Sequence, residues 1–276
     1  MTSSTARISP TAFATGYMWF RLGLSHPALA TPRGKRLDRA FSLAIQPNRF
    51  LGRTGTFDRL MLARHRGIDY FLEQAIEAGK VTQIIEIAAG FSGRGWRMKD
   101  RYGDKIHYIE TDLPHMAKAK QDLLEAGNLL TDKHDVCILD ALLDDGPDSL
   151  ASITAQLDSS QGLAIITEGL MSYLDPNTAA GLWRRISSQL QPFPNGLYVS
   201  DGYIQSEVTG LTSTVIKTIL QRFVKGRLHN HYTSAEDASN KLTAHGFKSA
   251  TLHAARDIPA THALGNKPGG NRVRVL

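Results

Sequence analysis

Residues 81–93 have the sequence VTQIIEIAAGFSG, and this stretch decides the fold. The β-branched, apolar run up to Ile87 is typical of a strand that is buried on both faces. The residues that follow make a turn small enough for a ligand to approach the backbone: Ala88, Ala89, Gly90 and Gly93. A helical spacing resumes at Trp96 and Met98. The stretch therefore predicts a strand, a glycine-rich turn and a helix.

The same alternation extends along the chain on both sides of this stretch. Helical periodicity precedes it over 57–76, and Gly79 is a natural stop for that helix. Further strands are expected over 105–112, 134–140, 162–169 and 195–202, and further helices over 114–127, 146–157 and 176–190. Apolar strands that alternate with helices indicate a parallel sheet covered on both faces, so the fold class is α/β.

The end of the chain breaks this alternation. Residues 204–228 look helical without a strand, and a helix follows over 235–245. Two short strand candidates, 247–254 and 271–276, have no helix pattern between them, so we expect an antiparallel hairpin. A mostly parallel seven-stranded sheet that ends in such a hairpin resembles the class I methyltransferases that use S-adenosyl-L-methionine.

Carboxylates stand near the ends of four consecutive predicted strands. They are Glu86, the pair Glu110 and Asp112, Asp140, and Glu168. The carboxyl ends of parallel strands share one edge of the sheet, so these acids should ring a single crevice. An acid-rich crevice suits ribose hydroxyls, an ammonium group and a sulfonium, and it would repel a pyrophosphate. It therefore favours S-adenosyl-L-methionine over NAD. Glu110 and Asp112 could instead cap the helix that begins at Pro114.

Composition excludes several classes of protein. The chain has 276 residues, of which 42% are hydrophobic and 21% charged, and this suits a globular protein. No apolar run reaches the roughly 18 to 20 residues that span a bilayer, so no membrane association is expected. The single cysteine, Cys137, lies in an apparent buried strand and indicates a structural thiol in a reducing, cytoplasmic compartment.

The positive charge is concentrated at the N-terminus. Residues 1–67 hold 11 Lys/Arg against 2 Asp/Glu, whereas the whole chain has a net charge of +6. Such a segment could be a transit peptide, a nucleic-acid contact or a cap over an anionic substrate. The chain has no zinc pattern or recognition helix, so nucleic-acid binding rests on charge alone and is not expected. His229 and His231 lack a third ligand at metal spacing, and no metal site is predicted.

Four motifs in order resemble the leucine carboxyl methyltransferase family, which includes bacterial relatives that O-methylate polyketides and other small molecules. The motifs are LARHRGIDYFLEQAI at 62–76, QIIEIAAGFSGRGWRMKD at 83–100, YIETDLPHMAKAKQDLL at 108–124 and ITEGLMSYLDP at 166–176. The resemblance implies S-adenosyl-L-methionine as cofactor and S-adenosyl-L-homocysteine as product. It also implies a small-molecule acceptor.

The resemblance carries roles to individual residues. Arg64 would meet the cofactor's carboxylate, Gly90 would lie along its backbone, and Asp112 would hold the ribose hydroxyls. The full set of implied or expected cofactor contacts is Arg64, Glu86, Ala88, Gly90, Asp112, Asp140, Ala141 and Glu168. Asp140 and Ala141 would border the adenine, and Glu168 would approach the ammonium group.

The acceptor side is expected to combine two segments with the family motif. Tyr173, in that motif, would face the substrate and is a candidate catalytic residue. Residues 1–56 would form a helical cap on a methyltransferase domain of 57–276, and a lid insertion over 203–232 would supply the rest. Tyr17, Arg21, Tyr173 and Tyr203 are the expected acceptor contacts, and Arg33, Arg49 and Arg53 are further cations that could pair with an acidic substrate.

One departure from the family pattern is visible in the first turn. Ala88 replaces the first glycine of Gly-x-Gly-x-Asp-Thr-Arg, and Ser92-Gly93 replace the Asp-Thr before Arg94. The predicted function is methyl transfer to a carboxylate or hydroxyl of a small, acidic or phenolic acceptor, by a monomer or homodimer. Two alternatives stay open: a nicotinamide-dependent oxidoreductase, and a fold relative that binds the cofactor without transferring methyl.

Overall fold

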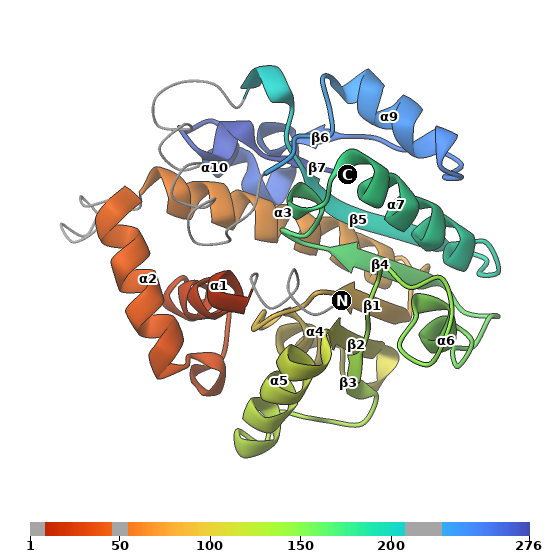
Figure 1. The fold of residues 1–276 in the computed structure, drawn as a ribbon, viewed down its shortest axis with the longest axis horizontal. Helices are drawn as coiled ribbons and strands as arrows, with labels where there is room; N and C mark the ends of the chain where they lie inside the picture. The colour runs from red at the N-terminus through yellow and green to blue at the C-terminus, as the bar shows by residue number, and fades with distance from the viewer. Residues whose placement is uncertain (1–8, 46–54, 208–227) are drawn as a thin grey trace.

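A computed structural model describes residues 9–45, 55–207 and 228–276, and the sheet dominates it (Figure 1). The seven strands described are β1 (Gln83–Ile87), β2 (His107–Asp112), β3 (His134–Ile138), β4 (Leu163–Thr167), β5 (Gly196–Gly202), β6 (His253–Ala254) and β7 (Arg274–Val275). Their order is β3-β2-β1-β4-β5-β7-β6. The first five strands are parallel, while β7 pairs antiparallel with both β5 and β6. The predicted sheet, including its antiparallel finish, is therefore confirmed.

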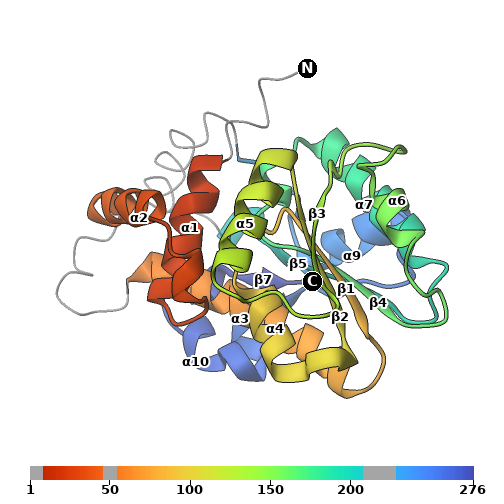
Figure 2. The same cartoon turned by 90° about the horizontal axis from the view of Figure 1, so that it is seen from below.

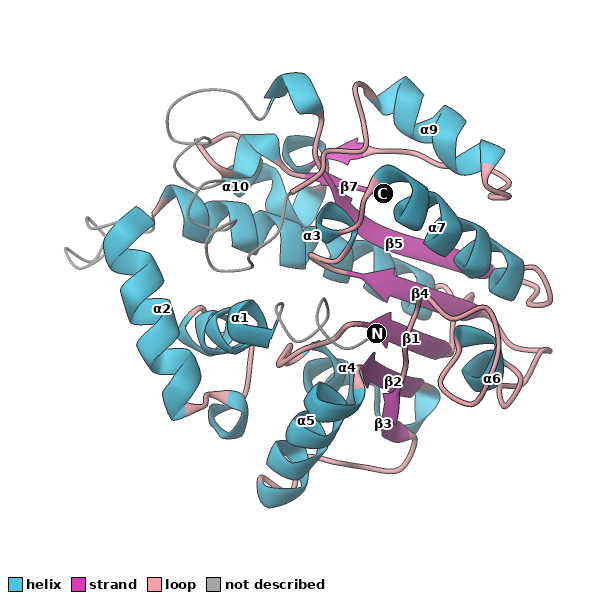
Figure 3. Ribbon diagram, viewed as in Figure 1, coloured by secondary structure: helices cyan, strands magenta, loops and turns pink. Residues whose placement is uncertain are grey.

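Helices lie on both faces of this sheet (Figure 3). The described α-helices are α1 (Ser9–Arg21), α2 (Pro32–Ile45), α3 (Thr56–Glu77), α4 (Arg94–Tyr102), α5 (Pro114–Ala126), α6 (Leu150–Thr154), α7 (Pro176–Leu190), α9 (Ala235–Ala244) and α10 (His262–Gly265). Single 3-10 turns connect several elements: η2 (Pro27–Leu29), η4 (Gly103–Lys105), η5 (Met171–Tyr173), η6 (Gln205–Glu207), η7 (Ala255–Asp257), η8 (Pro259–Thr261) and η9 (Gly270–Arg272).

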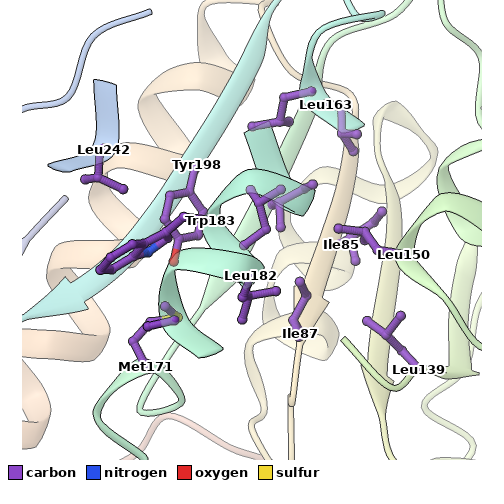
Figure 4. Packing of buried hydrophobic residues seen from close by; sticks show 14 of the residues in the cluster. Ile85, Ile87, Leu139, Leu150, Leu163, Met171, Leu182, Trp183, Tyr198 and Leu242 are labelled. Atoms are coloured by element: carbon purple, nitrogen blue, oxygen red, sulfur yellow. The ribbon is translucent and has the colours of Figure 1, made fainter. Parts of the chain in front are cut away.

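Alternate residues of each strand build the two halves of the core. Ile85 and Ile87 pack with α6, α7 and α9, where Leu182 and Trp183 are also buried (Figure 4). Ile84 instead packs on the opposite face, in a cluster with residues of α3 and α4. Figure 2 shows α3, α4 and α5 on one side of the sheet and α6, α7 and α9 on the other. The period of two along β1 also sends Glu86 to the side of α3 and α4.

α1, η2 and α2, which we call the N-terminal cap, lie beyond the carboxyl ends of the parallel strands (Figure 1). α1 packs directly on the turn after β1, since a Cβ atom added to Gly16 would fall 2.4 Å from the Cβ of Phe91. A Cβ atom added to Gly93 would likewise fall 2.6 Å from the Cα of Ser25, just after α1. Glycine at both positions therefore lets the cap rest on the first turn of the sheet domain.

Three sequence expectations about secondary structure need correction. The helix expected over 146–157 is only Leu150–Thr154, because Ser149 caps it by accepting from the Ser152 amide. The strands expected over 247–254 and 271–276 shrink to two residues each, and α10 with three 3-10 turns lies between them. β3 is an edge strand, so Cys137 is half-buried rather than buried.

Further expectations concerned the segment 204–228, membrane-spanning helices and metal sites. Most of the predicted helical segment 204–228 lies outside the described residues, as do Arg49 and Arg53. Within the ranges described, no helix combines the length and apolar character that crossing a bilayer requires. Those same ranges contain no group of three or more His, Cys, Asp or Glu side chains placed to hold a metal ion.

Candidate active site

A cavity of about 350 Å³ opens where the parallel strands end and the N-terminal cap begins. Residues of β1, β2 and β5 and of the segments that follow β1 and β4 line one part, and α1, α2 and α3 line the other. Ten residues singled out from the sequence lie on its wall: Arg64, Glu86, Ala88, Gly90, Asp112, Asp140, Ala141, Glu168, Tyr173 and Tyr203. The structure thus brings together residues that are far apart in the sequence.

The turn after β1 forms the floor of the cavity. Ala88 and Gly90 both have left-handed backbone conformations, with φ of 55° and 52°. The Gly90 amide donates to Asp112 Oδ2 at 2.8 Å, and the Leu113 amide donates to Asp112 Oδ1 at 2.8 Å. Burial raises the pKa of Asp112, and these two amides oppose that rise. Asp112 is therefore fixed at the end of β2 with its carboxylate beside the turn.

A buried arginine ties the walls of the cavity together. Arg94 is fully buried at the start of α4. Its guanidinium donates to Asp69 Oδ1 at 2.6 Å, to Glu168 Oε2 at 2.6 Å and to Glu86. Tyr108 donates its hydroxyl to the other oxygen of Glu86 at 2.7 Å. One cation thus holds carboxylates from α3, β1 and the end of β4. Each of these buried charges therefore has a partner of opposite sign.

Glu168 is the most heavily engaged acid of the site. His65 Nδ1 lies 2.8 Å from Glu168 Oε2, and Arg64 Nε donates to Oε1 at 2.8 Å. Burial would raise the pKa of Glu168, but His65, Arg94 and Arg64 outweigh it and hold that pKa well below its usual range. Burial and the charge of Arg94 lower the pKa of His65, so the ring is neutral and donates from Nδ1.

Arg64 joins this network to the far side of the cavity. Its Nη1 lies 3.8 Å from Asp201 Oδ2, and Asp201 Oδ1 accepts from the Gly169 amide at 2.7 Å. The carboxylates of Glu168 and Asp201 overcome burial and raise the pKa of Arg64. Burial raises the pKa values of Tyr173 and Tyr203, so both side chains are neutral hydroxyls at physiological pH.

The part of the cavity under the cap is apolar. Its wall includes Met18, Trp19, Phe41, Phe57 and Met61, all of which are less than a tenth exposed. Trp19 lies against the ring of His65, with 4.4 Å between centroids and 32° between the ring planes. The apolar wall is therefore joined directly to the charged network at the strand ends.

Two residues expected to contact the acceptor are placed elsewhere. Arg21 forms ion pairs with Asp38 at 3.3 Å and Asp58 at 2.8 Å, so its charge holds the cap to α3. Tyr17 faces α2, where a Cβ atom on Gly34 would lie 3.1 Å from its Cβ. Neither residue lines the cavity. Arg33 also lies off the wall, with its guanidinium over the ring of Phe13 at 4.4 Å.

Glu110 was expected among the acids that ring the crevice, but it does not line the cavity. α4 covers it: a Cβ atom on Gly95 would fall 2.3 Å from Glu110 Oε1. Its carboxylate instead pairs with Lys120 and accepts from His134 Nε2 at 2.8 Å. Lys120 and His134 are themselves buried, so this charged group stabilises the contact of α5 with the sheet.

Sequence reasoning missed Asp201 and much of the network of charged groups around Glu168 and Arg94. Asp201 lies in β5 near its end, so the rule applied to the first four strands would have found it. His65 and Asp69 lie in α3, whose sequence shows only the pattern of an amphipathic helix. Arg97 lies in the first turn of α4. Arg97 donates to Asp69 at 2.8 Å, and only the packing of α3 against α4 reveals that pair.

Comparisons with solved structures agree with this architecture. The chain superposes on a DUF574 family protein from Streptomyces avermitilis with a TM-score of 0.64 and 12% identity, over 95% of each chain. A protein from Thermobifida fusca YX, named as a methyltransferase, gives a TM-score of 0.61 and 14% identity over 95% of this chain and 92% of that one. These likenesses show that the chain has the fold of the class I methyltransferases.

Sequence comparison narrows this class to one family. The family model for leucine carboxyl methyltransferase matches residues 28–187, and the chain belongs to this family. A Mycolicibacterium smegmatis protein, named as an S-adenosyl-L-methionine-dependent methyltransferase, is 27% identical over 226 residues, or 79% of this chain and 72% of the relative. S-adenosyl-L-methionine is accordingly the cofactor.

A second relative matches a shorter stretch. A Mycobacterium tuberculosis (strain H37Ra) protein of the same name is 30% identical over 125 residues, which is 45% of this chain. The match spans only 38% of that relative's length. The acceptor of the present chain must therefore be argued from its own residues.

Proposed function

We propose that this protein transfers the methyl group of S-adenosyl-L-methionine to an oxygen atom of a small, largely apolar acceptor. One observation carries the proposal: the cavity continues from the strand-end acids to the apolar wall under the cap. A cofactor and an acceptor can thus share one enclosed space. The cavity of about 350 Å³ is in the size range of small-molecule sites.

The residues at the strand ends fit this cofactor. Asp112 can accept two hydroxyl hydrogen bonds from a ribose, and its charge would repel a phosphate. Gly90 has no side chain, so the turn leaves room for a ligand at this position. A Cβ atom added to Gly90 would lie 3.3 Å from the Cβ of Ala12. Arg64 and Glu168 offer opposite charges to the carboxylate and ammonium of the methionine part, and Asp140 with Ala141 borders the adenine.

The bound cofactor supplies a methyl group that its sulfonium has already activated. The chain's contribution is then to bring the acceptor oxygen to about 3 Å from the methyl carbon and to exclude water. The apolar wall formed by Met18, Trp19, Phe41, Phe57 and Met61 would hold the acceptor's body. Tyr173 and Tyr203 offer neutral hydroxyls that can orient a polar group of the acceptor.

The N-terminal cap has a defined part in this proposal. Residues 1–56 would cap a methyltransferase domain of 57–276, and the segment 203–232, of which 208–227 lie outside the described residues, would complete the lid. Gly16→Ala should push α1 off Phe91 and weaken binding of both cofactor product and acceptor. Gly181→Ala is a matched control, since its Cβ would meet only the flexible end of Arg185, at 3.1 Å.

Calorimetric titration with S-adenosyl-L-homocysteine, with NAD as the control ligand, tests the cofactor half of the proposal. Micromolar binding of S-adenosyl-L-homocysteine alone is the expected result. Incubation with S-adenosyl-L-methionine and a panel of hydroxyl, phenol and carboxylic acid compounds then tests transfer, read as a mass gain of one methyl group. Binding without any methylated product would favour the alternative, a relative that has lost transfer. The acceptors of secondary metabolism, polyketides among them, belong in the panel.

A further inference from the structure

The carboxylates on the cavity wall differ in how fully other groups engage them. Glu86 is held by Arg94 and Tyr108, and Glu168 by Arg94, Arg64 and His65. Asp112 accepts two backbone amides in the turn, and Asp140 Oδ1 accepts the amide of Leu142 at 3.0 Å on the side expected to border the adenine. Glu86 and Glu168 are therefore engaged by the Arg94 network, and Asp112 and Asp140 lie on the side expected to bind the cofactor.

Asp201, like Asp140, has one oxygen held by a backbone amide, but it lies on β5, at the opposite end of the parallel strands from β3. Its Oδ1 accepts the Gly169 amide at 2.7 Å, while Oδ2 lies 3.8 Å from Arg64 Nη1, beyond hydrogen-bond distance. The side chain lines the cavity although the residue is only 6% exposed. One carboxylate oxygen is thus fixed by the backbone, and the other is presented beside Tyr203 at the acceptor side of Arg64.

We propose that Asp201 is the general base for methyl transfer, and that the acceptor is consequently a hydroxyl compound or phenol rather than a carboxylate. This inference rests on the proposed function and identifies its acceptor. A carboxylate needs no base and would be repelled by Asp201, whereas a hydroxyl loses its proton as it attacks. Of the two wall acids whose second oxygen has this freedom, Asp140 follows β3 on the side expected to border the adenine, and Asp201 lies on β5 near Tyr203.

The distribution of cations supports a neutral acceptor. Among the described residues of the wall, the arginines are Arg64 and Arg272. Arg64 already faces Glu168 and Asp201, so its charge is matched by two carboxylates. His115 lies at the ribose side of the wall, near Asp112. The apolar wall would favour an uncharged phenol over a carboxylate, which loses far more hydration on burial.

The surroundings of Asp201 suit it to accept a proton. The titratable groups that face it are Arg64 from α3, Glu168 after β4, Tyr173 from η5, Tyr198 and Tyr203 from β5 and its end, and His229, His231 and Tyr232 from the segment before α9. Burial raises the pKa of Asp201 above its usual value, and Arg64 and the Gly169 amide oppose this rise. Tyr173 and Tyr203 have raised pKa values and cannot serve as bases at neutral pH.

The step balances with the cofactor as the only co-reactant. The acceptor oxygen forms a bond to the methyl carbon, and its proton passes to Asp201 Oδ2. The bond between that carbon and sulfur breaks, and its electron pair stays on sulfur. The products are the methyl ether, S-adenosyl-L-homocysteine and a protonated Asp201, which then releases its proton to solvent.

Asp201→Asn tests this role, because the amide oxygen can still accept the Gly169 amide. We expect kcat with a phenol that the native protein methylates to fall by about 10²–10⁴-fold while the Kd of S-adenosyl-L-homocysteine changes less than about twofold. The native rate should decline at acid pH as Asp201 is protonated, and this limb should be absent from the variant. Asp144→Asn, which removes an exposed carboxylate paired with Arg185, is the matched control.

A binding measurement separates this inference from the proposed function. The absorbance of 4-nitrophenol reports its ionisation, and the complex of the protein with S-adenosyl-L-homocysteine should bind the neutral form in preference to the anion. Asp201→Asn should reverse that preference without any turnover. A large loss of S-adenosyl-L-homocysteine affinity in the variant, an unchanged kcat, or an unchanged 4-nitrophenol preference would each overturn the role of Asp201. Absence of methylation by the native protein would instead count against the proposed function.

Discussion

Arg94 donates to Glu168 at 2.6 Å, and this bond links the first turn of the sheet to the acid that follows β4. The same guanidinium reaches Asp69 on α3 and Glu86 on β1. Three elements that are distant in the sequence therefore depend on one buried cation for their relative positions. The cofactor side of the cavity is shaped by a residue that does not line it.

Replacing Arg94 should cost far more stability than replacing an exposed arginine of the same helix. Arg94→Met leaves Asp69, Glu86 and Glu168 buried without their shared cation, and we expect a loss of about 3–5 kcal/mol in the free energy of unfolding. Arg101→Met removes the ion pairs of a half-exposed side chain with Glu73 and Glu77 and its contact with the Tyr102 ring, for a loss below about 1 kcal/mol. Urea unfolding of both variants measures the difference, and equal losses would contradict this account of Arg94.

Ala88 is strained, and glycine should relieve the strain. A left-handed conformation costs a non-glycine residue roughly 1–3 kcal/mol, and glycine loses part of that gain through the entropy of the unfolded chain. Ala88→Gly should therefore stabilise the protein by about 1 kcal/mol. Ala89→Gly, at a neighbour outside the left-handed region, should destabilise it by roughly 0.5–1 kcal/mol. Thermal unfolding of the pair would show shifts of opposite sign, and shifts of the same sign would rule the explanation out.

Asp112 and Glu110 lie two residues apart in β2 and should behave differently. Asp112→Asn removes a charged acceptor at the cofactor side, so the Kd of S-adenosyl-L-homocysteine should rise about 10- to 100-fold. Glu110→Gln should leave that Kd unchanged and lower stability instead, because Lys120 loses its buried partner. Calorimetry and urea unfolding separate the two effects. A raised Kd in Glu110→Gln would show that Glu110 does contribute to the cofactor site.

His134 should make stability fall as the pH is lowered. Burial and the charges of Lys120 and Lys99 lower the pKa of His134 to about 4, whereas an unfolded histidine has a pKa near 6.5. Because the unfolded state binds the proton more readily, the free energy of unfolding decreases between about pH 6.5 and 4, by up to about 1.4 kcal/mol per pH unit. His134→Gln should show a shallower slope over this range in urea unfolding. Parallel slopes would show that His134 is not the titrating group.

The sheet could be predicted because each of its five parallel strands carries a local signal. β1 to β5 are apolar, β-branched runs, and the turn at Ala88–Gly90 and the helix-stopping Gly79 mark where elements end. The strands expected over 247–254 and 271–276 were predicted too long because a two-residue strand has almost no sequence pattern. The helix expected over 146–157 was predicted too long because Ser149, and not the acids before it, caps α6. Local signals thus set the order of elements better than their lengths.

The candidate site was only partly predictable, for a different reason. Residues at strand ends, such as Asp112 and Glu168, are brought together by topology alone, and the order of the strands suffices to place them. Arg21 could not be placed in that way, because its pairing with Asp38 and Asp58 depends on how α1 packs on α2 and α3. Glu110 shows the same limit, since the helix that covers it decides whether a strand-end acid meets the cavity.

The contact between Gly16 and Phe91 also has a consequence for how the protein is made. A ribosome releases α1 well before the turn that contains Phe91, so the helix emerges without the surface on which it packs. Phe13, whose ring lies 4.7 Å from the ring of Phe91 in the finished protein, lacks that partner during the interval. We expect the nascent cap to be a binding site for chaperones until the first half of the sheet has been synthesised.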